Sequence, residues 1–588
     1  MFKFKISSIA LTVAALTSSV AWADPSSYTH ISGTKVIDIE KPNAAGVSHN
    51  MYREFNVDSK GVVLNNSSAD VSHTTLGNIP KNNNLTDGAA SVILNEVLSN
   101  KASTLNGFLE VNGQKADVII ANPNGITCSG CSFINTNRTV LTTGNVALDD
   151  TGALKDITVT GGKLTVNNGG MNVQDSYAIL LAEAVTLNGT VNATNALIAA
   201  GSFTYDTTKD TIAPAGKKPG NLSQNSIDIS NLGGVKADSI TMVGNNLGFG
   251  VRNQGTIAAT SKLVILSNGA LVNEGNITSN GISTQLLGAS IKNTGSIKTN
   301  NTTTLNSASS FSNTGTIQSD TQLSVTSAGN FENKGTVKGT GTLSVNSGGN
   351  VTNTSGASLL SDNQIMVTAA NNVDNAGTIS SQITRVAFGG SSLTVSGEMA
   401  GTNTLIVQSA KDNALSTGQI TNSGKLTGTN IALQTNGNIN QHGTINASGM
   451  LIANGNTFLN NGTIKADTLN ITSAKMQNKK DIDANAITIT ASNQILNEGK
   501  LTAVNDMQLI TGKEGNITNR NTITAGGILT MTTGKVDNGG YGCGLFNWFS
   551  CGTGTLNANQ LILNSTHSFA QEMGGTQNFK STVINTVL

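Results

Sequence analysis

The feature that most constrains the fold is a repeat of about twenty residues that fills the second half of the chain. Segments of the form apolar-x-Asn-x-Gly-x-Ile recur at this spacing. Alternate residues of an extended chain share one face, so the apolar residue, the Asn, the Gly and the Ile point the same way. Copies of the motif begin at Asn253, Asn273, Asn293, Asn313, Asn333, Asn375, Asn422, Asn460, Asn497 and Asn519, with weaker copies at Asn353 and Asn478.

One unit of this size cannot bury its apolar face alone, whereas stacked units can if each forms one coil of a parallel β-helix. Strands of successive coils would then lie about 4.8 Å apart. The inward asparagines would stack into a ladder in which each amide donates to one neighbour and accepts from the other. The repeat therefore predicts an all-β protein whose shaft is a parallel β-helix with about 20 residues per coil.

Proline and charge divide the chain further. All six prolines precede residue 220, because a stacked strand cannot spare the N–H that proline lacks. We therefore expect an irregular N-terminal domain, a polar boundary or large surface loop at residues 205–224, and then a regular rod. Formal net charge is +0 and only 12% of residues are charged, which predicts no nucleic-acid partner and no binding to an anionic membrane.

The N-terminus has the pattern of a secretory signal peptide. A basic start at residues 1–5 precedes a short apolar stretch at residues 6–20 and the small-residue cleavage site Ala21-Trp22-Ala23. Residues 1–23 are predicted to be removed. No later segment approaches 18 uninterrupted apolar residues, so we expect a secreted protein without a membrane anchor of its own.

A dense segment, "VIIANPNGITCSGCSFIN", spans residues 118–135. Its CxxC pair could be a disulfide, a redox site or a metal site. A structural zinc site usually needs four ligands, and neither a second CxxC nor histidines at ligand spacing occur. A structural disulfide is favoured, and no metal or other cofactor is expected. In an oxidising compartment the four cysteines would form two local disulfides: Cys128, Cys131, Cys543 and Cys551.

The segment "ANPNGITCSGCSFINTNRTVLTTG" closely resembles the secretion domain of two-partner-secretion exoproteins, the filamentous haemagglutinin and haemolysin family. "FNVDSKGVVLNNS" at residues 55–67 and "ILNEV" at residues 93–97 fit in the same order. By itself, Asn-Pro-Asn-Gly is ordinary β-turn chemistry. The resemblance makes it a secretion motif consisting of Asn122, Pro123, Asn124, Gly125 and Ile126, and it matches either Asn65 or Asn66 to an earlier asparagine of the family.

The resemblance also implies a route and an architecture. A dedicated outer-membrane transporter with periplasmic recognition domains would bind the N-terminal domain. The chain would cross unfolded and fold outside as a right-handed β-helix, either released or held at the cell surface. We expect a secretion domain at residues 24–250 that caps the helix, a repeat shaft at 251–540, and a cysteine-bounded aromatic loop with end coils at 541–588.

The C-terminal loop breaks the repeat. Two readings remain open for its aromatic cluster: a hydrophobic plug on the last coils, or an exposed contact to a target membrane or receptor. The cluster lies between Cys543 and Cys551 and contains Leu545, Phe546, Trp548 and Phe549.

For function, the resemblance implies a non-enzymatic haemolysin or adhesin that acts at the surface or membrane of host or neighbouring cells. The alternatives are the N-terminal part of a contact-dependent growth-inhibition toxin, although we expect no toxin module after Cys551, and a β-helical polysaccharide-degrading enzyme. The enzyme is disfavoured because no Asp/Glu cluster recurs at coil spacing, so no catalytic residue is predicted.

Overall fold

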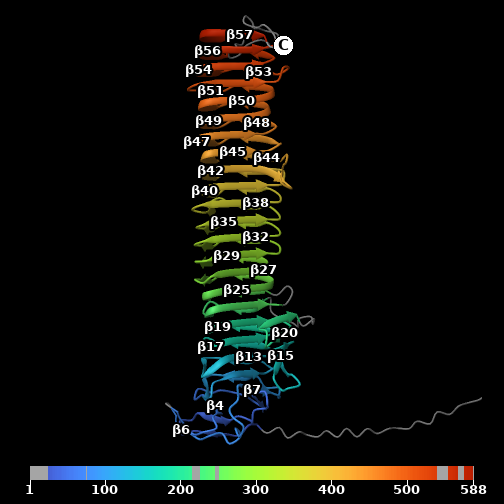
Figure 1. Ribbon diagram of the computed structural model, residues 1–588, viewed down its shortest axis with the longest axis vertical. Coiled ribbons are helices and arrows are strands. Elements are labelled where there is room, and N and C mark those ends of the chain that lie inside the picture. Colours follow the sequence, from blue (N-terminus) through green and yellow to red (C-terminus); the bar gives the residue numbers. More distant parts are fainter. Residues whose placement is uncertain are drawn as a thin grey trace, which may run out of the picture.

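The protein is a long rod of stacked coils, seen in a computed structural model that describes residues 24–73, 76–214, 225–245, 250–539, 554–566 and 575–586 (Figure 1). Every regular element in these ranges is a β-strand, and 51 strands join in one continuous sheet that winds along the rod. Within the same ranges, no apolar helix of membrane-spanning length occurs. The predicted all-β, parallel β-helical fold is confirmed.

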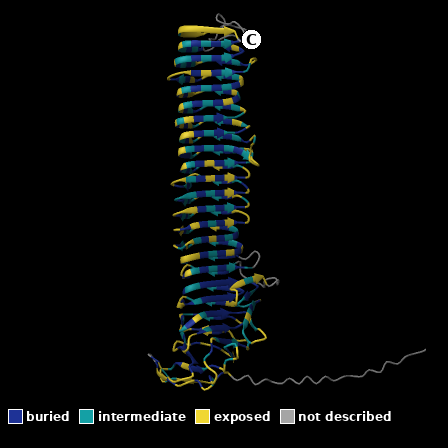
Figure 2. Cartoon of the chain, viewed as in Figure 1, coloured by how far each residue is buried: buried dark blue, intermediate teal, exposed yellow. Residues whose placement is uncertain are grey.

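Coils stack in strict parallel register. Strand β28 (Ser296–Thr299) pairs with β31 (Thr316–Ser319), which pairs with β34 (Thr336–Gly339). The register aligns Ile297, Ile317 and Val337 in one column, and all three side chains are buried. Along the strands of the shaft, buried residues alternate with intermediate or exposed ones (Figure 2). The alternation of apolar and polar residues in the sequence therefore gives each shaft strand one face in the buried interior and one face toward solvent.

The predicted asparagine ladder is present in the interior. From Asn253 to Asn375, each side-chain Nδ2 donates to the Oδ1 of the asparagine in the next coil at 2.8–2.9 Å. A second unbroken run extends from Asn460 to Asn538 at 2.8 Å. Within these two runs the ladder pairs the inward amides of successive coils and fixes the register, because a one-residue slip would leave the amides unpaired.

The same column continues into the N-terminal domain, where its residues are apolar. Successive coils place Leu105, Cys128, Val166, Leu187 and Ile229 at the position that Asn253 takes in the shaft. The asparagine repeat therefore begins where the column changes character, although the coils on either side of the change stack in the same way.

A second layer covers one outer face of the first coils. Strands β14 (Asn145–Leu148), β15 (Leu154–Val159), β20 (Phe203–Asp206) and β21 (Thr211–Pro214) form a separate antiparallel sheet. Strand β21 and the end of β20 lie within residues 205–224, where the sequence predicted a boundary or loop. The sheet buries Phe203 and Tyr205 against outward apolar side chains of the coils, including Ile119, Ile179 and Leu197.

An ionic cluster fastens this covering sheet to the coils. Arg138 forms an ion pair with Asp210 at 3.2 Å, and its guanidinium lies 5.5 Å from the centre of the Tyr177 ring. The hydroxyls of Tyr177 and Tyr205 both donate to the Asp210 carboxylate. Burial and the neighbouring Asp210 carboxylate raise the pKa of both tyrosines above the ordinary value, so both stay protonated donors.

Candidate functional site

The segment from Asn122 to Ile126 forms a tight turn between β10 (Ala116–Ala121) and β11 (Ile126–Cys128). The N–H of Gly125 donates to the carbonyl of Asn122 at 3.0 Å and closes a four-residue β-turn. Gly125 has φ +114°, and a Cβ there would lie 3.1 Å from the Lys163 carbonyl oxygen. Glycine is therefore required at this position.

Asn122 joins three successive coils. Its side chain is fully buried, and its Nδ2 donates to the carbonyl of Lys101 and to the hydroxyl of Ser103, each at 2.9 Å, in the preceding coil. Its main-chain N–H donates to the carbonyl of Thr142 in the following coil at 2.9 Å. Its Oδ1 accepts the N–H of Asn124 at 3.0 Å. One asparagine thus holds the turn closed and keeps the coils in register.

The other motif residues divide between surface and core. Pro123 and Asn124 are exposed at the tip of the turn, and Asn124 Nδ2 donates to the carbonyl of Ser99 at 2.7 Å. Ile126 is 1% exposed and packs in the core between two neighbouring coils. In the folded protein, the motif therefore presents only two of its five side chains to solvent.

The two candidate asparagines of β4 (Val62–Asn66) are both buried. Asn65 Nδ2 donates to Asp38 Oδ1 at 2.7 Å, and Asn65 Oδ1 accepts from Asn112 at 2.9 Å. Asn66 exchanges two hydrogen bonds with the main chain of Ala90, at 2.7 and 2.8 Å. Each therefore has its own structural task, Asn65 between coils and Asn66 in holding a connecting loop.

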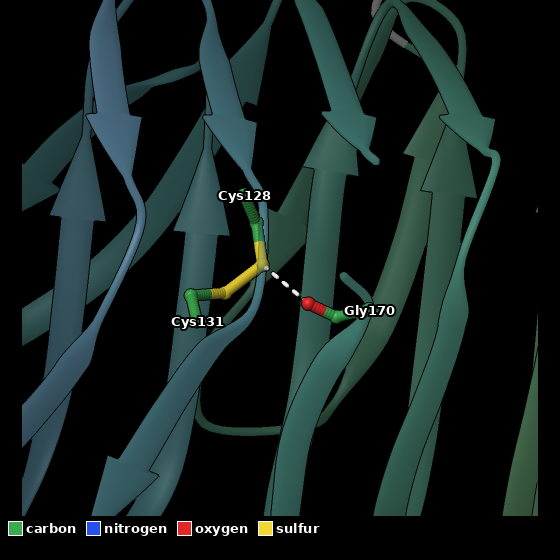
Figure 3. Close-up of a disulfide and its surroundings, with 3 residues drawn as sticks. All are labelled: Cys128, Cys131 and Gly170. Carbon is green, nitrogen blue, oxygen red and sulfur yellow. Dashed lines mark hydrogen bonds between the residues drawn. A yellow bond between two sulfur atoms is a disulfide. The ribbon is translucent and has the colours of Figure 1, made fainter. Parts of the chain in front are cut away.

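Cys128 and Cys131 form a disulfide across the turn between β11 and β12 (Cys131–Ile134), with their Cα atoms 5.4 Å apart (Figure 3). Cys128 Sγ lies 3.2 Å from the Gly170 carbonyl oxygen. This is a close contact without a hydrogen bond, because a disulfide sulfur carries no proton. Both residues are at most 2% exposed, which is typical of a structural pair and unlike a reactive one.

Other predicted residues lie outside the described part of the chain. These residues are Cys543, Leu545, Phe546, Trp548, Phe549 and Cys551 of the C-terminal loop. Both interpretations of the aromatic cluster, and the disulfide between the two cysteines, therefore stay predictions. Among the residues that the structure does describe, no group of His, Cys, Asp and Glu could hold a metal ion.

Sequence reasoning missed a further buried amide beside Asn65. Asn82 is 2% exposed, and its Nδ2 donates to the carbonyls of Ile39 and Asn65 at 2.8 and 3.0 Å. It lies in the polar run "KNNNL", residues 81–85, which has no periodicity and looks like a solvated loop. The covering sheet was also missed, because its short alternating strands look like any others in this chain.

Comparison with known proteins gives matches concentrated at the N-terminal side. Residues 23–273 match the family model described as TPS secretion domain, where TPS stands for two-partner secretion. A tRNA nuclease CdiA of Yersinia mollaretii is 40% identical over 249 residues, which is 41% of this chain and 8% of that protein. A 16S rRNA endonuclease CdiA of Enterobacter cloacae subsp. cloacae is 38% identical over 243 residues, 41% of this chain and 7% of that protein.

A Toxin CdiA of Escherichia coli is 37% identical over 243 residues, 41% of this chain and 8% of that protein. This chain thus spans a small part of the length of the relatives that it matches. Among solved structures, a filamentous hemagglutinin secretion domain is 29% identical; the match covers 51% of this chain and 94% of that one, with a TM-score of 0.40.

These relatives overturn one prediction. The prediction that the protein is not an enzyme is wrong, because relatives that share its N-terminal domain are named as nucleases. That prediction rested on the absence of an Asp/Glu cluster at coil spacing. The segment shared with these relatives makes up only 7–8% of their length, so carboxylates along the coils say nothing about the chemistry of the rest of those proteins.

Proposed function

Because residues 23–273 match the two-partner-secretion domain model, we propose that this chain is a two-partner-secretion exoprotein, that a dedicated outer-membrane transporter exports it, and that it acts on neighbouring bacterial cells by contact. The protein is secreted across the outer membrane to the cell surface or released. The names of the relatives, toxin and nuclease, support a role in contact-dependent growth inhibition. This role replaces the haemolysin or adhesin as the leading candidate.

The burial of Asn122 carries the proposal for export. In the folded coil its amide is fully buried and bonded to Lys101 and Ser103, so nothing outside the protein can contact it. The recognition domains of the transporter therefore bind the motif before the coil closes, while the chain is extended. The same side chain then ties the coils together after export.

The repeat supports folding outside the cell. Each coil contacts only its neighbours, so coils can add one at a time as the chain emerges. The change of the interior column from Ile229 to Asn253 supports a boundary near residue 250 between secretion domain and shaft, as the sequence predicted. The shaft would hold whatever lies beyond it at a distance from the producing cell.

Export is tested with the substitution Asn124→Ile in cells that also express the transporter. Asn124 is exposed, so its loss leaves the core packing intact while it changes the tip of the motif. We expect the protein to accumulate in the periplasm and to disappear from the medium. Asn188→Ile is the matched control, because it alters another Asn-Gly turn of the same domain and should be released normally.

Refolding of both purified variants, followed by circular dichroism, distinguishes loss of recognition by the transporter from loss of the ability to fold. Undiminished release of Asn124→Ile into the medium would remove the motif from the proposal. Equal retention of both variants would mean that any damaged turn blocks export, which also contradicts a specific address.

A second candidate function is a haemolysin or adhesin, favoured by the Cys128–Cys131 pair, since a CxxC after the motif is typical of the haemolysin-like branch. Purified protein mixed separately with bacteria and with red cells distinguishes the two. Binding to bacteria alone supports contact-dependent inhibition. Binding to red cells or release of haemoglobin supports the second candidate, and binding to neither contradicts both.

A further inference from the structure

The asparagine ladder of the shaft is interrupted at one coil. Strand β39 (Val373–Asn375) pairs with β41 (Ser392–Val395), which pairs with β44 (Gln419–Asn422). The register aligns Val395 between Asn375 and Asn422. Val395 is 1% exposed and thus takes the inward position that asparagine holds elsewhere in the shaft.

Only the amide is missing at this point. Gly397 follows Val395 by two residues, as glycine does in the regular motif. A Cβ on Gly397 would lie 2.1 Å from the carbonyl oxygen of Gly377, the same close approach that Gly315 makes to Gly295 at 2.0 Å. The backbone of this coil therefore has the regular turn geometry, so it could accept an asparagine in place of the valine.

The missing amide leaves polar groups without their usual partners. Asn375 Nδ2 finds no side-chain amide oxygen in the next coil and keeps only its bond to the main-chain carbonyl of Glu398, at 2.9 Å. Asn422 is 2% exposed, and its Oδ1 has no hydrogen-bond partner. Asn253 Oδ1 also has no hydrogen-bond partner, because the first run of the ladder begins there and no asparagine precedes it in the column. A buried acceptor without a donor costs about 1–3 kcal/mol.

A second gap follows two coils later. Asn422 donates to Gln441 at 2.6 Å, but Gln441 Nε2 turns to the main-chain carbonyl of Thr463 at 3.5 Å. Asn460 Oδ1 accepts the main-chain N–H of Gly462 instead of a side-chain amide. One isolated amide pair therefore lies between two long ladder runs.

The same region contains an enlarged coil. Asn422 lies 27 positions after Val395, against 20 between regular asparagines such as Asn293 and Asn313. The added residues form a hairpin from β42 (Glu398–Lys411) to β43 (Ala414–Leu415). Two left-handed residues shape its turn, Asp412 and Asn413, with φ of 51° and 63°.

We propose that the coils between Asn375 and Asn460 form a seam that divides the shaft into two blocks, Asn253–Asn375 and Asn460–Asn538, which open and close separately. The stability of a solenoid is a sum of coil terms and nearest-neighbour interface terms. Of the four coil interfaces between Asn375 and Asn460, three lack the ladder bond, and Asn422 contributes a buried acceptor without a donor. Local opening therefore begins at the seam, while each block opens as a unit.

Hydrogen exchange of the purified full chain, followed by mass spectrometry, tests the seam. Amides of residues 383–454 should exchange faster than the matching strand amides of residues 297–345. In Val395→Asn, the new Oδ1 would accept from Asn375 and the new Nδ2 would donate to Asn422. We expect exchange in the seam to slow about tenfold and exchange in residues 297–345 to stay unchanged.

Val367→Asn is the matched control. Val367 is equally buried, but its coil neighbours are Val345 and Val386, so a new amide finds no partner. This variant should exchange faster around the substitution. Uniform protection from residue 253 to 538 in the unmodified protein would overturn the proposal, whether or not either variant folds. The proposal would also be overturned if Val395→Asn, like Val367→Asn, made the amides around the substitution exchange faster than in the unmodified protein.

Discussion

Single asparagines hold this molecule together in two different ways. In the N-terminal domain, Asn122, Asn66 and Asn82 donate to main-chain carbonyls of other coils or loops, and each stands alone. In the shaft, asparagines bond mainly to one another. The first kind is a specific local contact that sequence can identify only through a motif, whereas the second repeats and is visible as a period.

The replacement Asn122→Ala tests the first kind. It leaves the Lys101 carbonyl and the Ser103 hydroxyl without their donor, and the Asn124 N–H without its acceptor. We expect the free energy of unfolding of the refolded protein to fall by about 3 kcal/mol. Urea denaturation followed by circular dichroism measures it. Asn124→Ala, at the exposed tip, should cost about 1 kcal/mol, and equal losses would contradict the special position of Asn122.

Among the elements, the coils were predictable and the covering sheet was not. The coils follow from alternation, because apolar side chains at every second position must face a common interior. The asparagine period reveals neither Gln441, which takes the place of an asparagine, nor Val395, where the ladder stops. The covering sheet leaves the coils by hairpins at residues 145–159 and 203–214, and alternation cannot tell a strand that stacks from one that folds back.

At the candidate site, the turn itself could be predicted, because Pro, Asn and Gly in this order favour one. The partners of Asn122 could not, since Lys101 and Ser103 belong to another coil. Their distance in sequence is set by loop lengths that carry no periodic signal. The contacts of Asn65 with Asp38 and Asn112 could not be predicted either, because these partners also lie in other coils.

The ladder predicts unequal effects along the shaft. Asn333→Ala removes a residue bonded to asparagines on both sides, whereas Asn375→Ala removes one bonded to an asparagine on one side only. We expect the first to lower the free energy of unfolding by about 1 kcal/mol more than the second. Urea denaturation of the two variants compares them. An equal loss, or a larger one for Asn375→Ala, would mean that amide pairing is not what stabilises the column.

At the scale of the whole molecule, the proposed export route requires the shaft to form after the chain has crossed the outer membrane. Its ladder positions from Asn253 to Asn538 alone extend about 67 Å at the spacing of stacked strands. A rod of this kind is held by contacts between residues about twenty positions apart. A covalent link at that separation, closed before export, would impose a folded loop on a chain that passes extended in the proposed route.

Cysteines introduced as Thr314→Cys and Lys334→Cys supply such a link. Both residues are exposed and occupy the same turn position in successive coils, so the finished rod accommodates the bond. We expect the double variant to be retained in the periplasm with its disulfide closed. Reductant in the growth medium should restore release, and each single variant should be released normally. Full release of the double variant with the disulfide closed would mean that the chain does not cross in an extended state.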